Sequence, residues 1–370
     1  YPTNLLTLKD FFMSILFEPT QIGRYTVRNR IFMAPMSRYR ALEGGINPKS
    51  TAQYYSQRAS AGLIMAESTR INNWSGGINC PGIYTDEQIA SWKETTEAVH
   101  EKGGVIFLQL WHAGRASHES LMPEGRDVVA PSAIPIQQEV MIENGMATPT
   151  PPRELTLDEI AELRADYGHA SRNALEAGFD GIEIHAAGGF LIDTFLQETT
   201  NKRDDQYGGS PENRFRFLRE VVEDAIEIWG ADRVGVKLSP TSQYNNVGDG
   251  NVLDTFKYTI SELNNYGLAF LEVNEEMPFT QLPPEKRALL DELRSYWTGP
   301  YIGNGNYTAE TGAQRISDNK ATAITYGRFF LANPDLPERF RRNAELNELD
   351  VNTFYGGDHK GYTDYPFLNN

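Results

Sequence analysis

Short apolar runs alternate with longer amphipathic stretches along almost the whole chain. Eight of the apolar runs have the length and composition of buried strands: residues 31–36, 63–69, 105–111, 181–185, 234–239, 269–274, 300–305 and 323–330. Three of the intervening stretches, residues 86–103, 157–178 and 210–230, have Asp or Ser near the first turn and Gly at the end, as capped helices do. Strands that alternate with helices in this way lie parallel and are buried on both faces. The pattern predicts an α/β fold, and eight such units favour a closed (β/α)8 TIM barrel.

Two segments depart from this repeat. Residues 17–30, before the first strand, have the pattern of a β-hairpin, which we expect to cap the bottom of the barrel. Residues 112–151, after the third strand, are rich in Pro and Gly and lack helical periodicity, so we expect an excursion of the kind that often covers a site. No G-x-G-x-x-G follows the first strand, which disfavours an open nucleotide-binding sheet. Residues 1–370 are expected to form a single domain.

Composition narrows the class of protein. The formal net charge of −16 argues against a nucleic-acid or membrane-surface binder, which would need a basic face. Cys80 is the only cysteine, so neither an intrachain disulfide nor a cysteine-based metal site can form, which fits a reducing compartment. The apolar start of the chain is interrupted by Lys9, Asp10 and Glu18, and predicts neither a signal peptide nor a membrane span. We expect a cytoplasmic protein, monomeric or homodimeric, that acts on a small molecule.

In a barrel of this kind the active site lies at the C-terminal ends of the strands. The residues at those ends, from the first strand to the eighth, are Pro35, Met36 and Ser37; Gln109 and Trp111; His185; Lys237; Gly305 and Asn306; Gly327 and Arg328. They include no acidic pair, which disfavours glycoside hydrolysis, and no cluster of carboxylates and histidines with metal-ligand spacing. No nucleophile elbow is present. The set is instead typical of a ring of residues that holds a cofactor.

Two parts of this ring indicate a phosphorylated flavin. The glycines and Arg328 at the ends of the seventh and eighth strands match the usual phosphate site of such barrels. Gln109 and Ser37 can hydrogen-bond the edge of a flat heterocycle, and Lys237 can place a positive charge against an anionic form of it. A dinucleotide fits less well, because no second site is visible in the sequence.

Several motifs in the same order resemble the Old Yellow Enzyme family of FMN-dependent ene-reductases. They are APMSRYRA, QLWHAGRAS, GFDGIEIHAAGGFLIDTFLQETTNKRDDQYGGSPENRFRFL, YGRFFLANPDLP and TFYGGDHKGYTDYP, and the resemblance runs from about Leu16 to Pro366. It implies non-covalent FMN that is reduced by a nicotinamide cofactor. NADPH is favoured over NADH, because it is the more usual reductant in the family. It also implies hydride transfer from flavin N5 to the β-carbon of an electron-poor alkene.

The resemblance also implies roles for the residues at the strand ends. Ser37 and Gln109 would hydrogen-bond the flavin ring, next to Pro35 and Met36, and Lys237 would lie near flavin N1 and the C2 carbonyl. The phosphate would be held by Gly305, Asn306, Gly327 and Arg328. Lys237 stands where the family more usually has Arg, so it supplies charge without a planar guanidinium.

The motif after the fourth strand departs from the family pattern. That pattern is His-x-x-Asn or His-x-x-His followed by Gly-Tyr; the polar pair binds the substrate carbonyl oxygen and the tyrosine protonates the α-carbon. Here His185 is kept, but Gly188 and Phe190 occupy the other two positions. One fixed donor commonly contributes about 10²–10³ in rate, and a general acid about 10²–10⁴. An unmodified family mechanism on a small enone is therefore expected to be slow.

Three explanations of this departure are open. The substrate brings its own polar group or binds in another orientation, with Gly188 making room for it. The proton comes from water or from another side chain, for which Tyr362 is a candidate. Alternatively, FMN serves isomerisation or desaturation rather than reduction. We expect a specialised, natural-product substrate in a pocket lined by Trp111 and Phe279. A flavin-binding protein without catalysis is the remaining rival.

Overall fold

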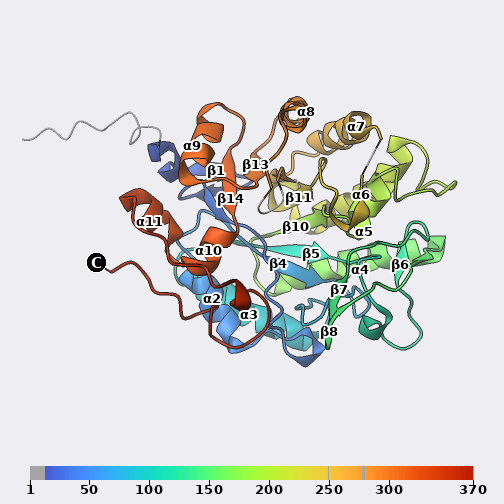
Figure 1. Cartoon of the computed structure of the whole chain (residues 1–370), viewed down its shortest axis with the longest axis horizontal. Coiled ribbons are helices and arrows are strands. Elements are labelled where there is room, and N and C mark those ends of the chain that lie inside the picture. Colours follow the sequence, from blue (N-terminus) through green and yellow to red (C-terminus); the bar gives the residue numbers. More distant parts are fainter. Residues whose placement is uncertain (1–12, 249, 277–279, 370) are drawn as a thin grey trace, which may run out of the picture.

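Eight parallel strands close into a barrel surrounded by helices, as the sequence predicts (Figure 1). The computed structural model describes residues 13–248, 250–276 and 280–369. In their order around the barrel the strands are β3 (Ile31–Met33), β4 (Ile64–Arg70), β5 (Ile106–Trp111), β10 (Gly181–Ala186), β11 (Val234–Leu238), β12 (Phe270–Asn274), β13 (Tyr301–Asn304) and β14 (Ala323–Tyr326). Strand β14 pairs with β3, which completes the barrel.

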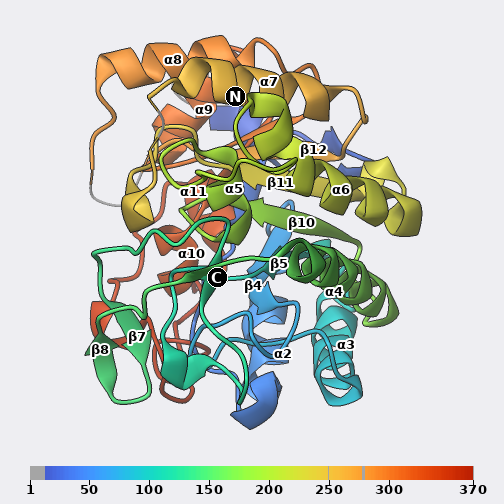
Figure 2. The same cartoon turned by 90° about the vertical axis from the view of Figure 1, so that its right-hand side faces the viewer.

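The helices lie outside the barrel and cover its strands (Figures 1 and 2). The α-helices are α2 (Lys49–Gln57), α3 (Asp86–His100), α4 (Leu157–Glu176), α5 (Leu191–Leu196), α6 (Pro211–Trp229), α7 (Val252–Asn264), α8 (Pro284–Arg294), α9 (Ala309–Ser317), α10 (Arg328–Ala332) and α11 (Leu336–Arg342). Short 3-10 helices are η1 (Ile15–Phe17), η2 (Glu43–Gly45), η3 (Glu119–Leu121), η4 (Ala231–Arg233), η5 (Tyr244–Asn246) and η6 (Val351–Thr353). Among the described residues, no helix combines the length and apolarity that crossing a bilayer requires.

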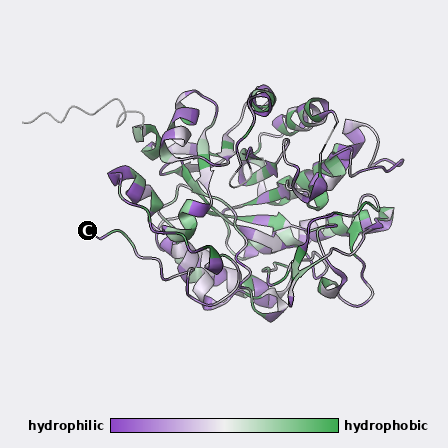
Figure 3. Ribbon diagram, viewed as in Figure 1, coloured by the Kyte–Doolittle hydropathy of each residue, from purple (hydrophilic) through white to green (hydrophobic). Residues whose placement is uncertain are grey.

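Local sequence explains why the predicted helices begin where they do. Thr85 and Thr156 form capping boxes with Gln88 and Glu159, and the side chain of Ser210 caps α6. Each helix presents an apolar face to the barrel and a hydrophilic face outward, so both kinds of residue appear along the outer helices (Figure 3). The strands, covered on both sides, are buried along almost their whole length.

The two predicted departures from the repeat are also present. Strands β1 (Thr20–Ile22) and β2 (Tyr25–Val27) form the N-terminal hairpin, and Ile22 and Val27 pack on Phe32, Phe107 and Phe270 near the starts of barrel strands. The excursion after β5 contains two small sheets, β6 (Val129–Ala130) with β9 (Arg153–Glu154) and β7 (Val140–Ile142) with β8 (Gly145–Ala147). The hairpin therefore closes the bottom of the barrel. The excursion, with β7 and β8, extends from the side of the barrel (Figure 2).

Two predicted strand ends are wrong. The first strand stops at Met33 rather than residue 36, because Pro35 has no backbone N–H with which to continue the ladder. The eighth stops at Tyr326 rather than residue 330, because the chain turns at Gly327 and enters α10. Phe330 is buried from a helix instead of a strand. Both errors lie at the mouth of the barrel, where the strands give way to loops.

Candidate active site

Side chains from three neighbouring strands meet at the C-terminal mouth of the barrel. In the sheet register Gln109 of β5 lies opposite Glu183 of β10, and His185 of β10 lies opposite Lys237 of β11. Gln109, His185 and Lys237 are only 1%, 8% and 6% exposed. The structure thus brings together the amide, imidazole and ammonium groups that the sequence singled out.

The ring of His185 is a fixed hydrogen-bond donor. Its Nδ1 accepts the backbone N–H of Ala187 at 3.3 Å, so the neutral ring carries its proton on Nε2. Burial, and then the charge of Lys237, lowers the pKa of His185 to about 3. The imidazole is therefore neutral at physiological pH, and its Nε2–H group can donate to a ligand.

Phe190 forms an aromatic wall beside this histidine. Its ring is edge-on to His185 at 5.2 Å, to Trp111 at 5.3 Å and to Tyr244 at 6.5 Å between ring centroids. Phe190 also immediately precedes α5, so the start of that helix holds it in place. Phe190 therefore lies between Trp111 and His185 and contacts both rings. Phe279, the other expected lining residue, lies outside the described residues.

Gly188 leaves open space next to Phe190. Its φ of +64° lies in the left-handed region that glycine adopts without strain. A Cβ built on Gly188 would meet nothing nearer than the Phe190 ring, at 3.5 Å. The backbone is nevertheless held, because its N–H donates to Ser239 Oγ at 2.8 Å and its carbonyl accepts from Asn245 Nδ2 at 2.8 Å. Gly188 therefore provides both the turn and room for a ligand.

Neighbours on both sides fix the orientation of Gln109. Its Oε1 accepts the hydroxyl of Ser68 at 2.6 Å, and its Nε2 donates to Glu183 Oε1 at 2.8 Å. A side-chain amide has two N–H donors and two acceptor lone pairs. One donor and one acceptor of Gln109 are therefore available to the edge of a heterocycle.

The end of the first strand lies against the end of the eighth. Pro35, Met36 and Ser37 are half-buried there. A Cβ built on Gly327 would lie 3.4 Å from Met36 Sδ, so glycine lets the two segments approach closely. The segment that contains Met36 and Ser37 and the backbone at Gly327 thus lie on the same side of the mouth.

Asn306 and Arg328 meet where β13 and β14 end. Arg328 Nη2 donates to Asn306 Oδ1 at 2.8 Å. The two residues line a cavity of about 540 Å³, whose other walls are Glu276, Thr280, Gln281 and Leu282. Gly305 borders the same loop, since a Cβ on it would lie 3.4 Å from Glu276 Cβ. A guanidinium and an amide in one cavity suit a phosphate group.

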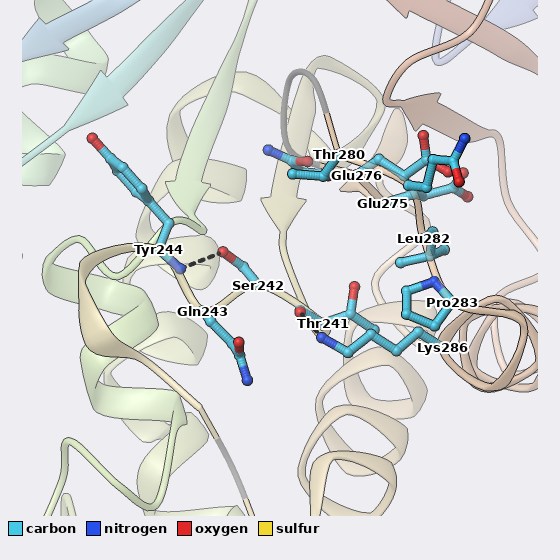
Figure 4. Close-up of a pocket in the computed structure, with 12 residues that line it drawn as sticks. Thr241, Ser242, Gln243, Tyr244, Glu275, Glu276, Thr280, Leu282, Pro283 and Lys286 are labelled. Atoms are coloured by element: carbon cyan, nitrogen blue, oxygen red, sulfur yellow. Dashed lines mark hydrogen bonds between the residues drawn. The ribbon is translucent and has the colours of Figure 1, made fainter.

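A second cavity, of about 380 Å³, continues from the first (Figure 4). The two share Glu276, Thr280, Gln281 and Leu282. Tyr244 forms one end of the second cavity, and Pro283 and Lys286 form the opposite side. The ring of Tyr244 also contacts Phe190. The walls that the two cavities share therefore lie between Arg328 and Tyr244. The donors along the mouth fit FMN. The cation of Arg328 suits the phosphate group, and the fixed amide of Gln109 suits the edge of the flavin ring.

Tyr362 lies elsewhere, which contradicts the prediction that it supplies a proton at the mouth. Its ring is 1% exposed and stacks on Tyr54 of α2, with 4.2 Å between centroids, and its hydroxyl donates to Thr51 Oγ1 at 3.4 Å. The guanidinium groups of Arg38 and Arg40 lie 5.1 and 4.5 Å from the centre of the same ring. Tyr362 anchors the C-terminal segment in the core.

Two tyrosines that sequence reasoning did not single out lie near the aromatic wall. Tyr355 is 54% exposed and stacks on Tyr39, with 5.0 Å between centroids. Tyr39 packs on the cluster that contains Trp111 and Phe190, and its φ of +51° is unusual for a residue other than glycine. Burial, and then Cys80 and Tyr355, raises the pKa of Tyr39. The Tyr39 phenol is therefore protonated at physiological pH.

Comparison with known proteins agrees with this geometry. The model of the NADH:flavin oxidoreductase / NADH oxidase family matches residues 15–347. The chain is 39% identical to 12-oxophytodienoate reductase 2 of Arabidopsis thaliana over 95% of this chain and 96% of that protein. Morphinone reductase superposes with a TM-score of 0.92 at 45% identity, with 96% of each chain covered. An Old Yellow Enzyme homologue from Zymomonas mobilis has a TM-score of 0.91 at 41% identity, covering 95% of this chain and 99% of that one.

The barrel and its mouth define a flavin-dependent oxidoreductase. The chain belongs to the Old Yellow Enzyme family, and it is an FMN-dependent NAD(P)H oxidoreductase. A structure of morphinone reductase in complex with tetrahydroNAD, 46% identical with a TM-score of 0.90 over 96% of this chain and 98% of that one, agrees with a nicotinamide reductant. The family, the fold and the cofactor expected from the sequence are thus confirmed.

Arg328→Gln is expected to weaken FMN binding about tenfold to hundredfold, because a hydrogen bond to a charged group contributes roughly 1.5–3 kcal/mol. Titration of FMN into the apoprotein, followed by flavin fluorescence, measures the Kd. Arg342→Gln is the control, because it removes the same charge from an exposed residue of α11 that pairs with Glu338. Equal FMN affinity in the two variants would contradict the assignment.

Enone binding to the oxidised enzyme through His185 is expected to show no proton-linked change between about pH 5 and about pH 8, because a histidine with a pKa near 3 stays neutral there. The change in the visible spectrum on titration with cyclohexenone gives the Kd at each pH. A dependence with an apparent pKa near the usual histidine value of about 6.5 would contradict this state of the ring.

Two buried carboxyl groups make a control necessary. Burial raises the pKa of Glu67 to about 7 and that of Asp193 to about 6. His185→Gln keeps a donor but removes the titrating ring. A pH dependence that persists in this variant belongs to the carboxyl groups, and one that disappears belongs to His185.

Proposed function

We propose that the protein reduces the activated C=C bond of an α,β-unsaturated carbonyl compound, with NADPH in preference to NADH as the reductant. The observation that carries this proposal is the neutral, buried His185, whose Nε2–H group lies at the mouth next to Gln109 and Lys237. Such a donor suits the oxygen of a substrate that gains negative charge during the reaction.

The cofactor contacts are proposed from the geometry of the mouth. Arg328 and Asn306 would hold the phosphate, with Gly305 and Gly327 allowing close approach. Gln109 and Ser37 would bind the edge of the ring, and Lys237 its pyrimidine end. When bound, FMN supplies a hydride, which it receives from the nicotinamide and passes to the substrate.

His185 would bind and polarise the substrate carbonyl. Hydride addition at the β-carbon moves negative charge to the carbonyl oxygen, and a donor that is already in place needs no reorganisation when that charge forms. Because His185 is 8% exposed, water competes poorly for the same oxygen. Lys237, its register partner on β11, adds positive charge to this region.

Protonation of the α-carbon must come from a group other than Phe190, which has no acidic proton. Tyr244 provides a phenol at the aromatic wall, with 6.5 Å between its ring centroid and that of Phe190. Burial, and then Tyr355, raises the pKa of Tyr244, so this hydroxyl keeps its proton. We propose that Tyr244 or solvent takes the place of the usual general acid.

The space around Gly188 favours a specialised substrate that is larger than a simple cyclic enone. A side chain is absent at Gly188, and the 380 Å³ cavity begins at Tyr244. Two relatives are named for the reduction of 12-oxophytodienoate and morphinone. These observations support a bulky natural product that bears a conjugated carbonyl group.

Product analysis under oxygen-free conditions tests the proposed reaction. Purified enzyme, NADPH or NADH, and a panel of enones and enals of increasing size are incubated, and the products are quantified by chromatography. We expect one equivalent of saturated carbonyl product for each nicotinamide oxidised. Nicotinamide oxidation that occurs only when oxygen is admitted, whatever enone is present, would overturn the proposal.

The second candidate function is isomerisation or desaturation of an unsaturated carbonyl compound without net reduction. The observation in its favour is Phe190, because a site without its general acid completes reduction poorly. A product with the same mass as the substrate but a shifted double bond, formed without net consumption of nicotinamide, would favour this function.

We also propose that the enzyme acts in the cytoplasm as a monomer or homodimer. The support is compositional: a net charge of −16 and a single cysteine, Cys80, which is buried and unpaired. The native mass of the purified enzyme measures its oligomeric state.

A further inference from the structure

A buried ion pair lies between β11 and β12, directly below the mouth. Lys237 Nζ is 2.6 Å from Glu272 Oε1, and Glu272 is 0% exposed. Thr325 Oγ1 also donates to Glu272 Oε1, at 3.4 Å, and Lys237 Nζ donates to Asn304 Oδ1 at 3.4 Å. The ammonium group proposed to face FMN is therefore already held by a carboxylate of the barrel interior.

A second buried carboxyl group, Glu183, adjoins this pair. It is 0% exposed and accepts the hydrogen bond from Gln109 Nε2. Burial, and then the charge of Glu272, raises the pKa of Glu183 well above its usual range. Among the described residues, the Oε2 atoms of Glu183 and Glu272 are both buried and have no donor from any other side chain. Two carboxyl groups placed together in this way retain one proton and carry one negative charge.

We propose that the Glu183–Glu272 pair neutralises Lys237 and thereby keeps the reduction potential of bound FMN lower than an unpaired lysine would. Glu183 and Glu272 act through Lys237 and Gln109, and are positioning residues for the flavin. The inference rests on the proposed function, in which Lys237 lies at the pyrimidine end of FMN.

The physical reason is the charge that reduction places on the flavin. Reduction leaves negative charge at N1 and the C2 carbonyl, and a nearby cation stabilises that form. The negative charge of the carboxyl pair offsets part of the positive charge of Lys237 at the flavin, because the carboxylate oxygen of Glu272 is only 2.6 Å from the ammonium nitrogen. The reduced cofactor is then less stabilised and is a stronger hydride donor to a substrate that meets few polar groups.

Spectroelectrochemical titration of the holoenzyme measures the effect directly. The Glu183→Gln/Glu272→Gln variant removes the negative charge, keeps similar volumes and keeps an acceptor oxygen toward both Gln109 and Lys237. We expect the reduction equilibrium of FMN to shift at least tenfold toward the reduced form, which is about 30 mV for a two-electron couple. Glu183→Gln alone is the matched control: it removes only the protonated partner, so the potential is expected to stay at the wild-type value.

Adding Lys237→Gln to the double variant is expected to return the potential toward that of the wild type, because both charges are then absent. A merely structural role for the two glutamates would not produce this reversal. If the double variant does not retain FMN, Glu272→Gln alone is measured. A smaller shift toward the reduced form is expected there, because the remaining charge moves to Glu183. No shift in a variant that binds FMN would overturn the inference.

A separate measurement tests the placement of Lys237. The nitrogen-15 NMR signal of FMN labelled at N1 reports a cation at that atom, and Lys237→Gln is expected to move it. An unchanged signal would overturn the proposed position of Lys237 beside the flavin. A changed signal combined with an unchanged potential in the double glutamate variant would overturn the charge pairing alone.

Discussion

Replacing His185 with alanine is expected to slow the oxidation of reduced FMN by an enone by about 10²–10³, because the only fixed side-chain donor of the family motif is lost. The carbonyl oxygen would then gain negative charge in a buried site without the Nε2–H group that stabilises it. Stopped-flow absorbance of enzyme reduced photochemically, and mixed with cyclohexenone without oxygen, measures this step independently of nicotinamide binding.

Reoxidation of the same variant by molecular oxygen is the control. Oxygen has no carbonyl group for His185 to polarise, so its rate is expected to change by no more than about threefold, an amount small beside the loss of a fixed donor. An enone rate that stays at the wild-type value in His185→Ala, with FMN bound, would show that the substrate oxygen lies elsewhere.

Phe190→Tyr is expected to raise the rate of the same enone step at least tenfold, because a positioned general acid contributes about 10²–10⁴. The Phe190 ring lies 5.2 Å from the His185 ring, so a hydroxyl added there would be next to the bound carbonyl compound. The same stopped-flow experiment measures the gain, and the oxygen rate again serves as the internal control.

Variants of two neighbouring residues, Tyr244 and Gly188, test which group supplies the proton and whether the site has room for a larger side chain. Tyr244→Phe is expected to slow the wild-type reaction but not the Phe190→Tyr reaction, because the new hydroxyl replaces it. Gly188→Asn is expected to be accommodated, since a Cβ meets the Phe190 ring at 3.5 Å and Tyr244 Cδ1 at 3.9 Å, and Asn tolerates the left-handed conformation. No gain in Phe190→Tyr would mean that protonation does not limit the reaction, or that the proton reaches the α-carbon from another direction.

The barrel could be predicted from the sequence because its signal is local. Each buried strand is a short apolar run, and each helix carries its own cap, so the alternation is visible without knowledge of contacts. The end of β14 could not be predicted in the same way. Phe329 and Phe330 continue the apolar composition of the strand, and only the backbone turn at Gly327 starts α10.

Residues at the strand ends could be assigned to the site because parallel strands in a barrel all end at one mouth. This rule found Gln109, His185 and Arg328. It did not find Glu183 and Glu272, which lie inside strands. Their signal was nevertheless present: a carboxyl group within an otherwise apolar run must have a buried partner.

The sequence alone could not predict which of the two C-terminal tyrosines, Tyr355 or Tyr362, lies near the mouth. Tyr355 and Tyr362 belong to the same motif, in a segment without α-helix or strand, so no periodicity determines which side chain faces the mouth. Contacts decide it: Tyr355 stacks on Tyr39 near the aromatic wall, whereas Tyr362 stacks on Tyr54 in the core. Tyr39 could not be found either, because its unusual backbone conformation leaves no mark in the sequence.

The most direct test of the proposed ene-reductase activity is a single anaerobic experiment. The enzyme is reduced with NADPH until the flavin absorbance is bleached, a conjugated carbonyl compound is added, and the return of the absorbance is followed. We predict full reoxidation with formation of one equivalent of the saturated product, slowly with cyclohexenone and faster with bulky enones and enals that fill the space at Gly188. Flavin that is bleached by NADPH but stays reduced with every conjugated carbonyl compound, and recovers only when oxygen is admitted, would contradict the account.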